Sequence, residues 1–195
     1  KVNWTNMMGG NMKDMEFHKW LEFQNECCER IVNNTVIGNE KEFEPHFYTP
    51  ENCLYQEFGK GQWGGAGHRI CSTVFDYDNA PYSNMVLGEV IGYPGKWSSY
   101  PPHWHPQPEI YFYKFNPENG YGFAELGEDV VKTHQNSTVF ITEKETHPQT
   151  TAPGYALWYL WVIRHLDGDP YITPTSIPAS TQGVSYNYPL RAESS

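Results

Sequence analysis

Short apolar runs separated by turn residues fill the chain from His68 onward. Each run is rich in Val, Ile, Phe or Tyr, and Gly, Pro, Asn or Asp stands between most of them. Seven runs are predicted to be strands: Arg69–Tyr77, Met85–Gly92, Ile110–Phe115, Gly122–Leu126, Val130–Thr133, Ser137–Thr142 and Ala156–Ile163. Short strands at this spacing are typical of an antiparallel sandwich or barrel. The pattern therefore predicts an all-β fold.

The flanking segments have a different pattern. A helix is predicted over residues 12–32, where apolar residues recur at near-helical spacing: Met15, Trp20, Phe23, Cys27 and Ile31. Residues 33–68 are rich in Asn, Glu, Gly and Pro, and the tail after Gly168 carries four prolines. We expect three parts: an N-terminal extension (1–68), a barrel (69–170) and an extended C-terminal arm (171–195).

Charge and composition narrow the choice of partner. The net charge is −10, and the Lys and Arg residues form no cluster, so neither nucleic acid nor an anionic membrane is expected. No stretch approaches the roughly 18 apolar residues of a membrane span. Aromatic residues make up 16% of the chain, and rings with polar groups can line a polar cavity. The same rings can equally supply much of a β-sheet core.

The cysteines and the first residues bear on the compartment. Cys27, Cys28, Cys53 and Cys71 lack CxxC spacing, and two of them are adjacent, which argues against a disulfide framework or a zinc ribbon. We expect free thiols. Residues 1–4 contain no apolar stretch of the kind found in a signal peptide. Both observations favour a reducing cytoplasm.

Candidate metal ligands lie in the segment Tyr100-Pro-Pro-His-Trp-His-Pro-Gln-Pro-Glu109. His103 and His105 are two residues apart, so both imidazoles point to the same side of an extended chain. Glu109 opens an apolar run, where a buried carboxylate is costly unless it is paired or ligated. His147 stands at the end of another predicted strand. An isolated His-x-His is often a surface coincidence, and a single histidine is more often a hydrogen-bonded core residue.

The combined spacing favours ligation. His-x-His-x3-Glu, followed about forty residues later by a histidine, resembles the two metal-binding motifs of the cupin superfamily, the second of which falls on Asn136, Thr142, Lys144 and His147. Three His and one Glu suit one divalent transition metal, with Zn or Mn favoured over Fe, Ni or Co. A five- or six-coordinate ion would keep a position open for substrate, as in a catalytic site.

A closer resemblance is carried by the block Gly88-Glu-Val-Ile-Gly-Tyr-Pro-Gly-Lys-Trp-Ser-Ser-Tyr-Pro-Pro-His103. It is similar to the 5-deoxy-glucuronate isomerases of inositol catabolism, which are cupins related to the uronate isomerases. Tyr111–Pro117 and His147–Leu160 extend the resemblance, as does the glycine-rich run Gly64–Arg69. It implies a double-stranded β-helix (jelly-roll) barrel, with an N-terminal extension that could be the remnant of a first cupin. It also places the metal on His103, His105, Glu109 and His147.

The resemblance implies an aldose–ketose isomerisation within carbohydrate metabolism, of 5-deoxy-glucuronate to 2-deoxy-5-keto-gluconate. A divalent ion on adjacent carbonyl and hydroxyl oxygens acidifies the C–H between them, and a base moves the proton. Tyr113, Lys114 and Tyr159 are the candidate catalytic residues, because they lie on strands next to the ligands. Lys114 could instead bind the substrate carboxylate. A homo-oligomer is expected, because β domains often associate through their edges.

Two other functions stay open. The domain could bind a sugar acid through its metal without turning it over, and ligand-dependent stabilisation without turnover would identify that role. It could also carry another metal-cupin activity, such as that of a dioxygenase or an epimerase. Oxygen consumption by an iron-loaded sample would identify a dioxygenase.

Overall fold

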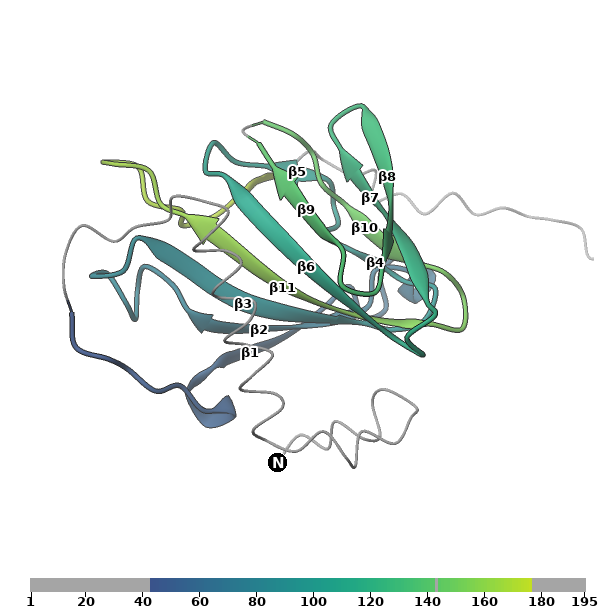
Figure 1. Ribbon diagram of the computed structural model, residues 1–195, viewed down its shortest axis with the longest axis horizontal. Coiled ribbons are helices and arrows are strands. Elements are labelled where there is room, and N and C mark those ends of the chain that lie inside the picture. The colour runs from purple at the N-terminus through teal and green to yellow at the C-terminus, as the bar shows by residue number, and fades with distance from the viewer. Residues whose placement is uncertain (1–42, 143, 177–195) are drawn as a thin grey trace, which may run out of the picture.

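The computed structural model describes residues 43–142 and 144–176, which form an antiparallel β structure (Figure 1). The larger sheet contains, in spatial order, β1 (Leu54–Phe58), β2 (Arg69–Phe75), β3 (Met85–Gly92), β11 (Ala156–Arg164), β6 (Glu109–Asn116) and β9 (Thr138–Ile141). The smaller sheet contains β4 (Trp97–Ser98), β10 (Gln149–Thr151), β7 (Tyr121–Leu126) and β8 (Asp129–His134). A two-stranded ribbon pairs β12 (Thr175–Ser176) with β5 (His103–Trp104). The described residues also include two 3-10 helices, η2 (Pro50–Asn52) and η3 (Trp63–Gly65).

All seven predicted strands are present, so the all-β prediction is confirmed. The structure adds β1, which lies in a segment expected to be irregular and is paired along its whole length with β2. The larger sheet therefore begins before residue 69, where the barrel was expected to start. The predicted helix over residues 12–32 lies outside the described residues, as do Cys27 and Cys28. Cys53 and Cys71 are free thiols, as expected.

The main core lies on the inner face of the larger sheet and includes residues of the smaller one. Its buried members are Val90, Tyr111, Tyr113, Phe115, Ala124, Val139, Ile141, Leu157 and Tyr159. A second cluster, Ile110, Phe112, Leu160 and Val162, lies on the opposite face. Burial of these apolar side chains is the main force that holds the strands together.

Alternation along β6 decides which side chains enter the barrel. Successive side chains of a strand point to opposite faces, so Glu109, Tyr111 and Tyr113 share the inner face. Ile110, Phe112 and Lys114 share the outer face. The strand therefore carries one buried carboxylate and two tyrosines into the barrel.

The part of the chain that the structure describes contains no helix with the length and hydropathy of a membrane span.

Candidate metal centre

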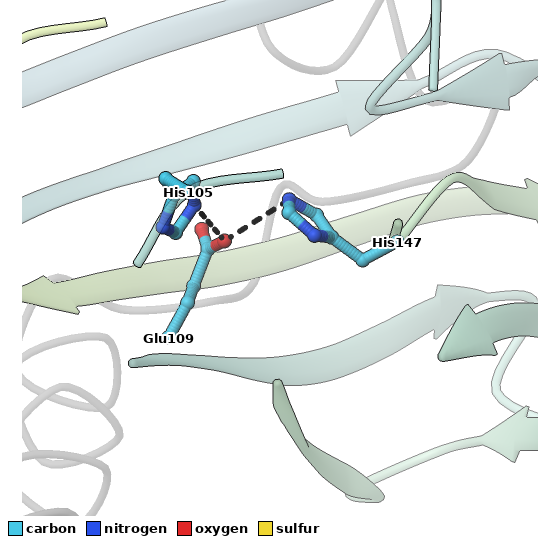
Figure 2. Close-up of side chains that lie close together, drawn as sticks. All are labelled: His105, Glu109 and His147. Carbon is cyan, nitrogen blue, oxygen red and sulfur yellow. Dashed lines mark hydrogen bonds and ion pairs between the residues drawn. The ribbon is translucent and has the colours of Figure 1, made fainter. Parts of the chain in front are cut away.

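Three of the four predicted ligands meet inside the barrel (Figure 2). The ligand atoms of His105, Glu109 and His147 all lie within 4.8 Å of one another, and each residue is at most 3% exposed. Oε2 of Glu109 lies 3.1 Å from Nε2 of His105 and 3.3 Å from Nε2 of His147. Glu109 opens β6, while the two histidines precede β6 and β10. The fold thus brings together residues from distant parts of the sequence.

Each imidazole is oriented by a backbone carbonyl. Nδ1 of His105 lies 2.8 Å from the carbonyl oxygen of Gln107, and Nδ1 of His147 lies 2.8 Å from that of Glu145. A carbonyl oxygen only accepts, so Nδ1 must carry the proton and donate it. In a neutral imidazole Nε2 is then a lone pair, and both lone pairs face the Glu109 carboxylate. Nε2 of His147 is buried and has no hydrogen-bond partner among the described residues.

His103, the fourth predicted ligand, lies beside this group. Its ring packs edge-on against that of His147, with the ring centroids 4.6 Å apart, and its Nδ1 lies 3.0 Å from the carbonyl oxygen of Pro101. Burial, with a smaller effect of the neighbouring His147, lowers the pKa of His103 to about 4. The imidazole is therefore neutral near pH 7, which is the form that binds a metal.

Converging acceptors of this kind suit a cation. Two Nε2 lone pairs and a carboxylate repel one another unless positive charge lies between them. A carbonyl that fixes Nδ1 of each histidine is the usual outer support of a metal-binding imidazole. The residues therefore fit a divalent metal ion, with His103 next to the three that meet most closely.

A cavity of about 560 Å³ opens beside this group over the inner face of the larger sheet. Its wall includes His103, His105 and Glu109, together with Tyr111 and Tyr159. A volume of this size is in the range of small-molecule sites. Three of the four predicted metal ligands therefore line the cavity.

Two buried tyrosines share a hydroxyl network on the cavity wall. Ser99 Oγ lies 3.0 Å from the hydroxyl oxygen of Tyr111 and 3.3 Å from that of Tyr159, which is also 2.5 Å from Ser98 Oγ. Burial raises the pKa of Tyr159 to about 12, although the hydrogen bonds with the two serines oppose the shift. Both phenols therefore stay protonated near pH 7.

The three candidate catalytic residues have different environments. Tyr159 lines the cavity. Tyr113 is fully buried in the core and donates a hydrogen bond to Oε1 of Gln149. Lys114 lies on the outer face of β6, where its Nζ donates to Oδ1 of Asn136 at 2.5 Å. The structure brings only Tyr159 to the cavity wall, because alternation along β6 turns Lys114 away from it.

Tyr113→Phe tests a supporting role for this phenol. Gln149 donates from Nε2 to the carbonyl oxygen of His147 at 2.6 Å, so Tyr113 holds the side chain that steadies a candidate ligand. Removing the hydroxyl leaves a buried acceptor unpaired, and we expect the free energy of unfolding to fall by about 1–3 kcal/mol. Urea unfolding measures this change. A folded, metal-loaded variant whose kcat fell about 100-fold or more would instead place Tyr113 in the chemistry.

Several residues of the site were not predicted from the sequence. Ser99 and Tyr111 lie inside segments used for the family resemblance, and alternation from Glu109 could have placed Tyr111 in the barrel. Tyr171 packs on His105 with ring centroids 4.9 Å apart, so the start of the expected C-terminal arm covers the site. Arg69 also lines the cavity, and its position at the start of a predicted strand gave no sign of this.

Comparison with known proteins relates the chain to sugar-acid isomerases. It is 28% identical over 113 residues to the 5-deoxy-glucuronate isomerase of Halalkalibacterium halodurans, covering 51% of this chain and 42% of that protein. It is 33% identical over 164 residues to the enzyme of the same name from Bacillus velezensis, covering 68% of this chain and 60% of that one. The chain thus spans less than two thirds of the length of these relatives.

The fold has solved counterparts. An IolB-like protein from Salmonella typhimurium aligns over 70% of this chain and 55% of its own, with a TM-score of 0.62 and 20% identity. The predicted cupin barrel is confirmed. The KduI/IolB family model matches residues 23–179, so the resemblance extends on both sides of the segments that first indicated it. The chain belongs to the KduI/IolB family.

Proposed function

We propose that this protein is a metal-dependent aldose–ketose isomerase of a sugar acid such as 5-deoxy-glucuronate. The observation that carries the proposal is the convergence of two imidazole Nε2 atoms on the Glu109 carboxylate, at the wall of a cavity large enough for a sugar. The relatives named 5-deoxy-glucuronate isomerase support the reaction class. His103, His105, Glu109 and His147 are the proposed ligands.

The donor set indicates the kind of ion. Three imidazoles and one carboxylate suit a borderline divalent metal, with Zn or Mn favoured over Fe, Ni or Co. When bound, such an ion polarises the substrate carbonyl and makes the neighbouring C–H more acidic. The protein fixes the imidazoles through the carbonyl oxygens of Pro101, Gln107 and Glu145.

Tyr159 is the proposed catalytic residue that the cavity geometry supports. Its hydroxyl is protonated near pH 7 and is held by Ser98 and Ser99, so it can donate a hydrogen bond to a substrate oxygen. Tyr111 can do the same, because its hydroxyl shares Ser99 and lines the same cavity. Fixed donors of this kind stabilise the negative charge that develops on oxygen as the proton leaves carbon.

Turnover by the metal-loaded protein tests the proposal. The protein is incubated with 5-deoxy-glucuronate and with common uronates before and after treatment with a chelator, and the ketose is followed by NMR. We expect conversion that the chelator abolishes and that added Zn or Mn restores. No conversion of any of these acids, while a curated relative succeeds in parallel, would contradict the proposal. Oxygen uptake by an iron-loaded sample would point to a dioxygenase instead.

A further inference from the structure

Among the residues that the structure describes, Arg69 is the only Lys or Arg on the wall of the cavity, which is also lined by the proposed metal ligands His103, His105 and Glu109. It opens β2, and alternation along that strand puts Arg69, Cys71 and Thr73 on the same inner face. The protein carries a net charge of −10, so an anionic ligand meets an unfavourable overall field. A cation inside the cavity is therefore where recognition of an anion would be concentrated.

The Arg69 guanidinium is held in place by backbone atoms. Nη1 donates to the carbonyl oxygen of Gly67 and Nη2 donates to that of Tyr100, each at 2.9 Å. The guanidinium also lies 5.2 Å from the ring centroid of Phe58. Because these contacts already fix the guanidinium, little side-chain entropy would be lost when a ligand binds to it, and this preorganisation favours binding.

No carboxylate of the described residues pairs with Arg69. Its two hydrogen bonds are to neutral carbonyl oxygens. Three of the five N–H donors of the Arg69 guanidinium therefore have no partner among the described residues. Burial lowers the pKa of Arg69, which means that its charge is partly removed from water. A partly desolvated cation without a counter-ion is costly, and an anionic ligand would offset that cost.

Arg69 and the metal ligands belong to one connected wall. The charge of Arg69 partly opposes the rise in the pKa of Tyr159 that burial causes, and the Tyr159 hydroxyl shares Ser99 with Tyr111. The ring of Tyr111 in turn lies 6.0 Å from that of His147 between centroids. A ligand in the cavity therefore has the proposed metal ligands at one side and a guanidinium at another.

We propose that Arg69 binds the carboxylate of the sugar acid while the carbonyl end lies at the proposed metal ligands. The position of the carbonyl end rests on the proposed function, whereas binding of the carboxylate by Arg69 does not. A guanidinium matches a carboxylate with two parallel hydrogen bonds, which an ammonium cannot do. Lys114, for which the sequence suggests the same role, lies on the outer face of β6.

Binding of a non-reactive sugar acid tests this assignment. Gluconate and its uncharged counterpart glucitol are titrated calorimetrically into the zinc-loaded protein, into Arg69→Gln and into Arg69→Lys. We expect wild type to bind gluconate at least about tenfold more tightly than glucitol, as a charged hydrogen-bonded pair allows. Arg69→Gln should remove that preference, because a glutamine side chain carries no charge. Arg69→Lys should keep part of it.

Lys132→Gln is the control. Lys132 is an exposed cation on β8 whose Nζ lies over the ring of Tyr121 on β7. The variant should keep the full preference for gluconate, since the charge that it removes is not on the cavity wall. An undiminished preference in Arg69→Gln would overturn the proposal and assign the carboxylate to the metal. Loss of stoichiometric metal in both Arg69 variants would also overturn it, because Arg69 would then act as a clamp on the loop before His103.

The experiment separates this inference from the proposed function. Gluconate has no carbonyl to isomerise, so its binding does not depend on turnover. A protein that binds gluconate through Arg69 but converts no uronate would keep the inference and lose the isomerase. If the protein is an isomerase, Arg69→Gln should raise KM for the sugar acid at least about tenfold with a smaller change in kcat.

Discussion

Glu109→Gln is expected to lower kcat/KM for sugar-acid isomerisation by about a thousandfold. Glu109 is the only anion among the four proposed ligands, and its Oε2 lies within 3.3 Å of Nε2 of both His105 and His147. A neutral amide of the same shape attracts a divalent ion far less strongly. Loss of a few kcal/mol of charge stabilisation in the transition state corresponds to this factor. Steady-state kinetics and metal content, measured on the same samples, report the effect.

Glu89→Gln is the matched control. Glu89 is a half-buried carboxylate on the larger sheet, but it lies on the outer face of β3, where its Oε2 accepts a hydrogen bond from Trp158 Nε1 at 2.8 Å. A glutamine can still accept that bond, so metal content and activity should stay near wild type. Wild-type kcat/KM in Glu109→Gln would remove Glu109 from the proposed chemistry.

Gly122→Ala is expected to destabilise the barrel by about 3 kcal/mol. A Cβ at Gly122 would lie 2.1 Å from the carbonyl oxygen of Thr150, and backbone on the neighbouring strand cannot turn away as a side chain could. β10 would have to move from β7, and it begins two residues after the proposed ligand His147. Urea unfolding should show the loss, and metal affinity should fall with it.

Gly92→Ala provides the comparison within the larger sheet. A Cβ there would lie 3.6 Å from the nearest atom, Leu157 Cβ, which is an ordinary contact. We expect a change in the free energy of unfolding of less than about 1 kcal/mol. If both substitutions lowered the free energy of unfolding equally, the close approach of β10 to β7 at Gly122 would not be the cause of the loss.

Much of the fold could be predicted because the strands carry their own pattern. β3 and β11 are long apolar runs bounded by turn residues, and their predicted and observed ends agree within one residue. β1 was missed because all of its side chains are exposed and it has no apolar alternation. β4, β5 and β10 are two or three residues long, too short for any periodic signal. Their pairing depends on tertiary contacts that the local sequence does not record.

The site residues that lie close together in the sequence could be predicted. His103, His105 and Glu109 lie within seven positions, and alternation predicts that the two imidazoles point to the same side of the chain. The same rule places Lys114 on the face opposite Glu109, so applying it along β6 would have excluded that residue from the cavity. Arg69 lies on β2, two strands away from β11, and only the sheet order brings it to the same wall. No spacing within the sequence reports such a contact.

Elemental analysis of the purified protein, beside the double variant His103→Ala/His147→Ala, tests the proposed metal centre most directly. His103 and His147 supply two of the three imidazoles, so their loss leaves a site too weak to retain an ion through purification. We expect about one equivalent of a transition metal in the wild type and almost none in the folded variant, with folding checked by circular dichroism. Stoichiometric metal in the variant would contradict the account.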